Sequence, residues 1–534
     1  MVELAAARHG TPMKSTSQGS SLASLTACIA LALATVPFPL AQAATPAPAL
    51  SHPGAARLRA QLRQSMPAAP KAPSSPAAVW PVTSCADDGS AGTLRAAAEA
   101  AGEGDTIDLT SLTCSTITLA QGAIPLLLND VAIIGPGANA LAIDGAGSDR
   151  VLIHPGNGTL TVTALTLRNG AANIGGYKIT GGGCIASSGY LVLDHSVVRD
   201  CQASAEGVYG GGIFAATVTM YTSTLSGSVA LGQNPNTGTA AFGGGVYTAY
   251  VNIVDSTISG NRAAHDLGDG QQSYDIGGGI FTNFGGSIRS STIDNNYSYG
   301  FGGGVAAFNG VINIANSTVS GNTAKTRGGG GLDLRVFYGE TISNSTITAN
   351  TAPAGGGILL RGRPDQFELQ STLVGGNTAA SGADVGSEQP TTLVGSNNLV
   401  VIADANVTLP GATLRAAPLL LPLAANGGPT RTHGLAPDSP AIDAGNNLAA
   451  LVTDQRGAGF PRVLGAAADI GAFEGVVAAV PIVLPSPAPA ASGWVLGALG
   501  LALAWLGIRA RRLQTAGTPV FTRLSPPGRH PSQR

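Results

Sequence analysis

The sequence predicts an all-β protein built as a parallel β-helix, and two observations carry this prediction. Glycine triplets recur along the chain, starting at Gly181, Gly210, Gly243, Gly277, Gly302, Gly328 and Gly355. A Ser-Thr or similar corner follows each triplet, as in "DSTISGN" and "NSTVSGN". The triplets are spaced by 25 to 34 residues, and repeats of this length indicate a solenoid. Stacked units then bury the apolar face that one unit alone cannot bury.

The segments between triplet and corner favour strands over helices. "VNIVDSTIS" and "INIANSTVS" alternate in places between apolar and polar residues, which suits strands with one buried face. No unit carries a helical apolar pattern, so helical and leucine-rich arrays do not fit. The triplet glycines can supply the positive φ values and close backbone approach that a tight corner needs.

Two further columns of side chains are expected to stack from coil to coil. Five residues after the corner Ser, or six in the last unit, stand Cys201, Ser228, Asn261, Asn296, Asn322, Asn350 and Asn377. Asparagines stacked at one turn can hydrogen-bond along the solenoid, and Asn tolerates left-handed backbone. Phe214, Tyr247 and Phe281 share one offset after the triplet and are expected to form a short aromatic stack.

The composition supports a folded, weakly charged protein and excludes some function classes. Hydrophobic residues make up 44% of the chain and charged residues only 11%, with 75 glycines. The formal net charge of −2 argues against a nucleic-acid partner, which would need a basic stripe. We find no Rossmann, P-loop or nucleophile-elbow fingerprint and no metal-ligand spacing among the histidines. We therefore expect neither a metal nor a cofactor.

The N-terminus predicts export. Arg8 and Lys14 precede the apolar run "LASLTACIALALATVPF" and the small residues "AQAA", so residues 1–43 read as a signal peptide cut between Ala43 and Ala44. A permanent membrane anchor is the alternative. Residues 44–79 are rich in Ala and Pro and read as a flexible linker.

The cysteines indicate disulfides. Cleavage of the signal leaves Cys85, Cys114, Cys184 and Cys201, and an even number in an exported protein favours pairing. Chain order suggests Cys85–Cys114 and Cys184–Cys201, although three connectivities are possible.

The C-terminus predicts attachment to a membrane. A Pro-rich linker, residues 475–492, leads into an apolar helix, residues 493–512, and a basic tail, residues 513–534. The basic cluster Arg509, Arg511 and Arg512 would stay cytoplasmic and leave the preceding chain outside. The tail loosely resembles PEP-CTERM and IPTL-CTERM sorting tails; a plain C-terminal anchor is the alternative. The expected location is the cell surface, the outer membrane or the extracellular space.

The folded region resembles a known group. "GTLRAAAEAAGEGDTIDL" predicts a short helix, Leu94 to about Ala101, within a cap (residues 80–130) that covers the open first coil. With "AIIGPG", "AIDG" and the triplet coils (residues 131–392), it resembles bacterial right-handed parallel β-helix proteins of the polymorphic-outer-membrane-protein-like and pectate-lyase-like superfamily. "PLAANGGPTRTHGLAPDSPAIDAGNN", "TDQRG" and "ADIGAFE" (within residues 393–474) resemble the choice-of-anchor Q module. The resemblance implies surface display and no particular ligand.

Two places are candidates for function. The longest variable segments, within residues 229–242 and 262–276, leave one edge of the solenoid, where insertions often form a binding wall; a solvated loop is the alternative. Separately, Asp333, Arg335, Arg361, Arg363 and Asp365 fall on the same segment of neighbouring coils.

These candidates leave the function open between three classes. The sequence favours non-catalytic adhesion, with an extracellular polysaccharide or a cell-surface partner as the ligand. The alternatives are a polysaccharide lyase or glycoside hydrolase that uses the strip from Asp333 to Asp365, and a structural component of the envelope or biofilm.

Overall fold

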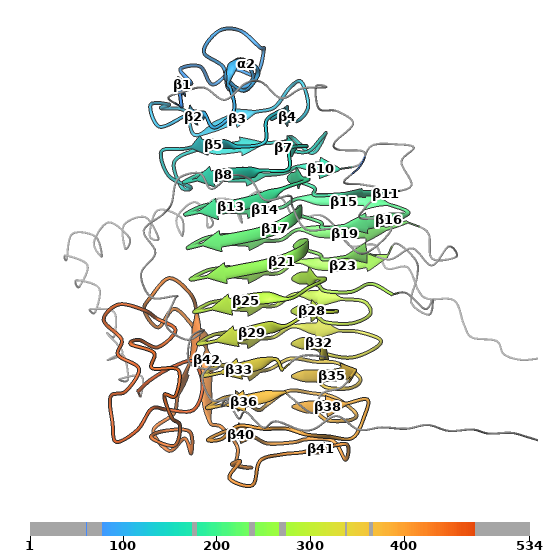
Figure 1. The fold of residues 1–534 in the computed structure, drawn as a ribbon, viewed down its shortest axis with the longest axis vertical. Helices are drawn as coiled ribbons and strands as arrows, with labels where there is room; N and C mark the ends of the chain where they lie inside the picture. Colours follow the sequence, from blue (N-terminus) through green and yellow to red (C-terminus); the bar gives the residue numbers. More distant parts are fainter. Residues whose placement is uncertain are drawn as a thin grey trace, which may run out of the picture. The chain divides into compact units, whose positions relative to one another are not determined.

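The computed structural model describes residue 60 and residues 77–172, 179–233, 241–265, 274–336, 339–362 and 367–475. The chain divides into two compact units, residues 1–476 and 477–534, and the described residues belong to the first. They form a right-handed parallel β-helix (Figure 1). The signal peptide with Ala43 and Ala44, and the C-terminal helix with Arg509, Arg511 and Arg512, lie outside the described residues. Within those residues, no helix is both long and apolar enough to cross a bilayer.

Strands of successive coils pair in parallel and form columns, named A to E here in the order the chain visits them. Columns A and B together make a 19-stranded sheet. Column A contains β4 (Ile124–Pro125), β7 (Leu152–His154), β12 (Ile185–Ser187), β24 (Ile280–Thr282), β28 (Val305–Ala307), β32 (Leu332–Val336), β35 (Ile358–Gly362) and β38 (Val385–Ser387). Column B contains β1 (Val79–Pro81), β2 (Thr106–Asp108), β5 (Val131–Ile134), β8 (Thr159–Thr163), β13 (Tyr190–Asp194), β25 (Gly286–Arg289), β29 (Ile312–Ala315), β33 (Thr341–Ser343) and β36 (Glu368–Gln370). The long strands β17 (Ile213–Tyr221) and β21 (Val246–Val254) run through both columns.

The chain then turns into columns C, D and E before it returns to column A. Column C contains β3 (Thr116–Thr118), β6 (Ala142–Asp144), β9 (Thr166–Arg168), β14 (Val197–Arg199), β18 (Thr224–Ser226), β22 (Thr257–Ser259), β26 (Thr292–Asp294), β30 (Thr318–Ser320), β34 (Thr346–Thr348), β37 (Leu373–Val374) and β40 (Leu399–Val400). Column D contains β10 (Ala171–Ala172), β15 (Gln202–Ala205), β19 (Val229–Gly232), β23 (Arg262–His265), β27 (Tyr297–Ser298) and β31 (Thr323–Ala324). Column E contains β11 (Ile179–Gly181), β16 (Gly207–Tyr209) and β20 (Ala241–Phe242).

The main core lies between columns A, B and C, and the period-two pattern explains why. Along β21, Val251 and Ile253 are buried, while the intervening Asn252 is partly exposed. The same alternation places Leu332 and Leu334 of β32 in the core, so Asp333 and Arg335 face outward. The outer face of the sheet therefore carries the side chains that the repeat leaves free to vary.

The glycine triplets form the corner that leads into column A. In five of the triplets the first glycine has a positive φ, as at Gly243 (70°) and Gly302 (62°). In the runs that start at Gly181 and Gly328, the second glycine has it: Gly182 (64°) and Gly329 (70°). A Cβ on Gly243 would lie 1.9 Å from the carbonyl oxygen of Val246, so the corner excludes any side chain.

The asparagine column stands inside the corner between columns C and D. Asn261, Asn296, Asn322, Asn350 and Asn377 are all buried. From Asn296 onward, each carboxamide oxygen accepts hydrogen bonds from the backbone N–H and the side-chain N–H of the preceding asparagine, at 2.9–3.0 Å. Each side chain also donates to a carbonyl of the coil before, as Asn322 does to Ile293 at 2.9 Å. The column thus ties successive coils together.

At each end of this column, a residue at the third-glycine position of a triplet is linked to a residue of the column. Cys201 stands in the column one coil before Ser228, and it is bonded to Cys184, which replaces the third glycine of its triplet. At the other end Asp384, also at a third-glycine position, accepts from the backbone and side-chain N–H groups of Asn377 at 3.1 and 2.9 Å. A Cβ on Gly304 would lie 2.6 Å from the carbonyl oxygen of Gly331 and 3.1 Å from the Asn322 carboxamide, so beside the asparagines this position favours glycine.

The two disulfides join the cysteines that chain order suggested. Cys85–Cys114 staples the cap and Cys184–Cys201 staples the coils, with Cα–Cα distances of 6.5 and 5.4 Å. Both distances fall within the usual range for disulfides. Such bonds form and persist in oxidising compartments, which fits an exported protein.

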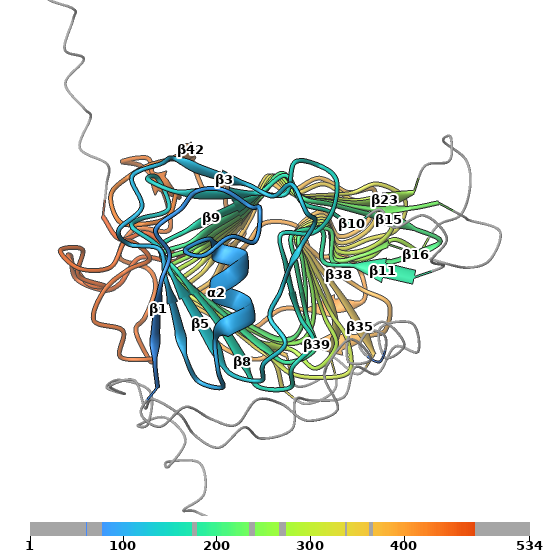
Figure 2. The ribbon, with the colours of Figure 1, turned by 90° about the horizontal axis from the view of Figure 1, so that it is seen from above.

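The helix α2 (Leu94–Ala100) covers the N-terminal end of the coils (Figure 2). Thr93 caps it by accepting from the Ala96 N–H at 3.2 Å, and Leu94, Ala97 and Ala98 are buried. Arg95 pairs with Asp87 at 2.8 Å. Burial raises the pKa of Asp87, but the hydrogen bond from Arg95 and those from the backbone N–H groups of Gln121 and Ala120 together outweigh it, so this pKa lies below its usual value.

Coil stacking continues past residue 392. β39 (Thr391–Thr392) pairs with β41 (Val407–Thr408), and the last bridge of column C joins Leu399 to Leu414. The following residues, 419–475, fold back over the outer face of column C (Figure 1). We call them the docked segment. It contains the antiparallel pair β42 (Leu420–Ala424) and β43 (Thr432–Leu435).

Side chains of the docked segment form hydrogen bonds and an ion pair with outward hydroxyl and carboxylate groups of column C. Gln455 bonds Thr318 at 2.6 Å, His433 contacts Ser320 at 2.8 Å, and Arg431 pairs with Asp294 at 2.5 Å. β26, β30 and β34 are consequently buried on both faces, whereas β18 and β22, in coils nearer the N-terminus, bury one face.

Candidate functional site

The strip of charged residues expected on neighbouring coils lies on the outer face of column A. Asp333 and Arg335 lie on β32, and Arg335 pairs in register with Arg361 of β35. Arg363 and Asp365 lie outside the described residues. The structure therefore brings three of the five expected residues together.

Asp333 is completely buried beneath this surface. It forms an ion pair with Arg361, whose side chain is 11% exposed. Burial raises the pKa of Asp333 to about 6, against the opposing effect of Arg361. Asp333 Oδ1 and Arg361 Nε are buried and have no hydrogen-bond partner among the described residues. The pair is joined by charge and by a hydrogen bond that Arg361 donates to Asp333 Oδ2, while these two other polar atoms stay without a partner.

Aromatic rings hold the arginines in place. The Arg361 guanidinium lies 4.3 Å from the ring centre of Phe301 and 5.0 Å from that of Phe308. Arg335 lies 5.7 Å from Phe308. Arg327 lies 5.3 Å from Tyr274 and 5.7 Å from Phe301. We call this cluster the arginine patch: Tyr274, Phe301, Phe308, Arg327, Arg335 and Arg361.

Sequence reasoning missed half of this patch. Phe301 and Arg327 come from the segments that cross towards column A, and Phe308 follows β28. The available signal was an arginine or aromatic residue near each of three successive triplets. These residues stand at different offsets from the triplet, so no single repeat position marks them.

The aromatic stack leads into the patch. Phe214, Tyr247 and Phe281 stand in register on column A, with ring centres 5.9 and 5.1 Å apart and planes within 10° of parallel. The next positions in this row are Ala306, Asp333 and Leu359. Phe281 also contacts Phe308 at 5.4 Å. The arginine patch thus begins where the aromatic repeat stops.

A second group of outward side chains lies on column B. Tyr250 is 42% exposed, and its ring centre is 5.4 Å from that of Phe284. Asn252, two residues after Tyr250, accepts a hydrogen bond from the Ser287 hydroxyl at 2.7 Å, and Asn313 continues the row on the next coil. We call Tyr250, Phe284, Asn252, Ser287 and Asn313 the polar-aromatic row.

The two segments expected to form a binding wall, residues 229–242 and 262–276, lie partly outside the described residues, which omit 234–240 and 266–273. In the second segment, His265 Nδ1 lies 2.7 Å from a carboxylate oxygen of Asp275, and both side chains are buried. The second carboxylate oxygen of Asp275 accepts from the Ala241 N–H at 2.9 Å. His265 and Asp275 thus contact each other across residues 266–273 of the sequence, and Tyr274, 53% exposed, belongs to the arginine patch.

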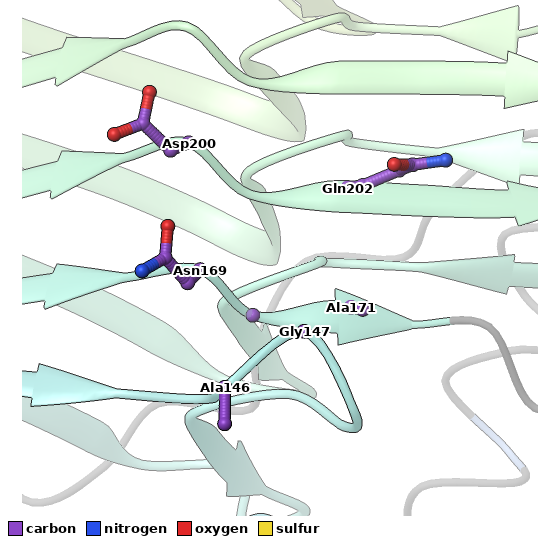
Figure 3. Close-up of a pocket in the computed structure, with 7 residues that line it drawn as sticks. Ala146, Gly147, Asn169, Ala171, Asp200 and Gln202 are labelled. Carbon is purple, nitrogen blue, oxygen red and sulfur yellow. The ribbon is translucent and has the colours of Figure 1, made fainter. Parts of the chain in front are cut away.

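A pocket of about 490 Å³ lies elsewhere, where the coils turn from column C into column D (Figure 3). Asn169 and Asp200 stand one above the other on successive coils, and Gln202 follows on the next strand. Asn169 donates to Asp144 at 2.9 Å and Asp200 pairs with Arg199 at 2.5 Å. The remaining walls come from Ala146, Gly147, Gly170 and Ala171. With its charged groups already paired, this pocket offers little chemistry.

In the arginine patch, the ion pair of Asp333 and Arg361 is the most enclosed part. The Asp333 carboxylate is inaccessible to solvent, and Arg361 is engaged with it. Among the residues described, no group of three or more His, Cys, Asp or Glu side chains could hold a metal ion.

Comparison with known proteins adds a fold likeness. The structure is similar to the crystal structure of pectate lyase Pel9A, with a TM-score of 0.36 and 14% sequence identity, covering 78% of this chain and 99% of that chain. This likeness concerns the fold alone. No family model and no curated protein matches the chain.

Proposed function

We propose that this protein is exported to the cell surface, where its β-helix binds extended glycan chains without cleaving them. The observation that carries the proposal is the polar-aromatic row on the outer face of the 19-stranded sheet. Exposed Tyr250 and partly exposed Phe284 offer ring faces beside the amides of Asn252 and Asn313 and the hydroxyl of Ser287. Sugar rings need both kinds of partner, because they present C–H faces and hydroxyl edges.

The geometry of a parallel β-helix suits a long polymer. Neighbouring strands lie about 4.8 Å apart, so equivalent outward side chains recur at a regular interval. An extended chain laid across several coils would meet an outward side chain at each of these intervals. Such a surface gains affinity from many weak contacts.

The ends of the chain complete the proposal. Residues 1–43 would direct export, and residues 493–512 would hold the protein at the membrane or direct its sorting. The docked segment would act as a choice-of-anchor Q-like module between the coils and that tail. Its firm attachment to column C would leave the outer face of columns A and B open to the surroundings.

The test measures binding and cleavage together. Purified full-length protein and the variant Y250A/F284A are applied to immobilised neutral and anionic polysaccharides, and both retention and new chain ends are scored. We expect the wild type to be retained without new ends, and the double variant to lose about tenfold in affinity through lost ring contacts.

The matched control is Tyr297→Ala, because Tyr297 lies on column D with its ring 5.0 Å from Arg262. This variant should bind like the wild type. New chain ends would overturn the non-catalytic proposal, and equal binding by Y250A/F284A and wild type would move the glycan away from this row.

A further inference from the structure

The arginine patch lies on the same sheet face as the polar-aromatic row but carries different chemistry. Arg335 and Arg361 stand on adjacent, paired strands of column A, and Arg335 is exposed. At the usual strand spacing of about 4.8 Å, two neighbouring guanidiniums repel each other unless an anion lies between them. Among the described residues, Arg335 forms no ion pair, whereas Arg361 is paired from below by Asp333.

Ring contacts prepare these guanidiniums for an oxyanion that accepts two hydrogen bonds side by side. A guanidinium stacked on an aromatic face keeps its N–H edge free for hydrogen bonds in the plane. The Phe308 ring contacts the guanidiniums of both Arg335 and Arg361, and the Phe301 ring contacts those of Arg361 and Arg327. Carboxylates and sulfates match such a fork with paired, charge-assisted hydrogen bonds.

Among the described residues, two guanidiniums and two carboxylates interact here: Arg335 and Arg361 with Asp333 and Glu388. Glu388 is exposed and follows Arg361 on the next coil, since its N–H bonds the Leu360 carbonyl. Because Asp333 is sealed beneath the surface, it neutralises Arg361 from one side without contacting anything outside.

We propose that the arginine patch is an anion-binding subsite of the glycan-binding face, taking a carboxylate or sulfate carried on a sugar chain, and that Asp333 sets its strength by competing for Arg361. This inference rests on the proposed function, because it names the class of glycan that the face binds. The Arg361 side chain is 11% exposed and bonds Asp333 through one terminal nitrogen, which leaves the other terminal nitrogen for a further ligand.

Protonation of Asp333 then regulates the subsite. The charged groups that act on Asp333 are Arg361 of β35, Arg335 of β32 and Glu388 after β38. Burial raises the pKa of Asp333 to about 6, so below that pH Asp333 becomes neutral and stops competing for Arg361. Anion binding should therefore strengthen as the pH falls through 6, although carboxylate and sulfate ligands themselves stay ionised well below that pH.

The experiment measures the affinity of the full-length protein for alginate, dextran sulfate, neutral dextran and poly-L-glutamate at pH 5 and pH 7.5, without Ca²⁺. We expect the two anionic glycans to bind about tenfold more tightly than dextran, and more tightly at pH 5 than at pH 7.5. Alginate reports carboxylate recognition and dextran sulfate reports sulfate recognition, so their ratio identifies the preferred anion.

Variants connect the binding to the patch. Arg335→Ala should weaken binding of both anionic glycans about tenfold while leaving dextran binding unchanged. Arg335 is exposed and outside the Asp333–Arg361 pair, so this variant should fold. The matched control is Arg289→Ala, another exposed arginine, on column B. Asp333→Asn should abolish the difference between the two pH values.

The outcomes separate the two proposals. Equal binding of dextran and the anionic glycans, or unchanged binding by Arg335→Ala, overturns the anion subsite and leaves glycan binding intact. Poly-L-glutamate binding as tightly as alginate, or no glycan binding at all, overturns glycan binding itself. Anionic-glycan binding that persists in Arg335→Ala but fails in Arg289→Ala would move the site to column B.

Discussion

The asparagine column and the arginine patch are both rows of side chains stacked on successive coils, yet they differ in what they leave unsatisfied. Inside the column, each asparagine oxygen accepts two hydrogen bonds and its N–H group meets an acceptor one coil away. In the patch, Asp333 Oδ1 and Arg361 Nε lack hydrogen-bond partners among the described residues. Identical asparagines on successive coils use each other's hydrogen-bond donors and acceptors, whereas the unlike side chains of the patch leave some donors and acceptors unused.

This difference suggests where to look for function in a solenoid. The aromatic row of Phe214, Tyr247 and Phe281 is regular, and it is part of a small second core. The next residues in that row are Ala306 and Asp333, and around this break the arginines gather. Positions that follow the repeat maintain the architecture, and positions that interrupt it carry the charges.

The largest expected effect comes from breaking the column. Asn322→Ala removes the acceptor for two N–H groups of Asn296 and the donor to the Ile293 carbonyl, all of them buried. Each buried group left unpaired costs about 1–3 kcal/mol, so we expect a loss of about 4 kcal/mol in the free energy of unfolding. Denaturant unfolding of the full-length protein measures it.

The control for this variant is Asn313→Ala, on the same coil but exposed on β29. Its side chain accepts one hydrogen bond, from the Thr341 N–H at 3.3 Å. A surface substitution of this kind should cost less than about 1 kcal/mol. If the two variants were equally stable, the column could not be what holds the coils in register.

The coils could be foreseen from the sequence because their signals are local. A positive-φ glycine, an apolar strand and a corner asparagine all fall within one repeat, and each has a backbone reason for its place. The corner serines were recognised as markers but not as a row of their own. In fact Ser256 accepts from the Ser223 N–H at 3.0 Å, and Ser291 accepts from the Ser256 N–H at 3.1 Å.

The docked segment and the patch could not be foreseen in the same way. The pairs Arg431–Asp294 and Gln455–Thr318 each join residues 137 apart in the sequence. No local pattern states which coils the segment will cover. The patch likewise depends on how far each crossing segment runs before it reaches column A, which the triplet spacing does not fix. Side-chain chemistry of this kind becomes visible once the register is known.

The next expected effect comes from opening the end of the column. Replacing Cys184 and Cys201 together with Ala removes a cross-link between residues separated by 17 positions. Chain-entropy arguments give about 3 kcal/mol for a loop of this length. Guanidinium unfolding under oxidising conditions measures the loss. An independent comparison is the effect of reduction on a variant in which Cys85 and Cys114 are replaced and only the Cys184–Cys201 bond remains. Unchanged stability of the double variant would show that Ser228 and Asn261 close the column without help.

The smallest expected effect tests the patch through pH. Because the pKa of Asp333 is about 6 in the folded protein and near 3.8 when unfolded, the folded state binds the extra proton between those values. The stabilisation from this group is therefore fully present at low pH and is lost as pH rises through 6, by about 2 kcal/mol and at most about 3. Asp333→Asn cannot titrate, so the wild type should lose stability relative to this variant between pH 4 and pH 7.

Urea unfolding of both proteins across that range measures the difference directly, and other titrating groups cancel because both chains share them. The buried His154 is an example: burial lowers its pKa to about 4, so it acts in the opposite direction in an overlapping window. A constant difference between wild type and Asp333→Asn from pH 4 to pH 7 would mean that Arg361 keeps Asp333 ionised throughout. In that case the patch would resemble the asparagine column, with its charges satisfied internally and nothing left for a ligand.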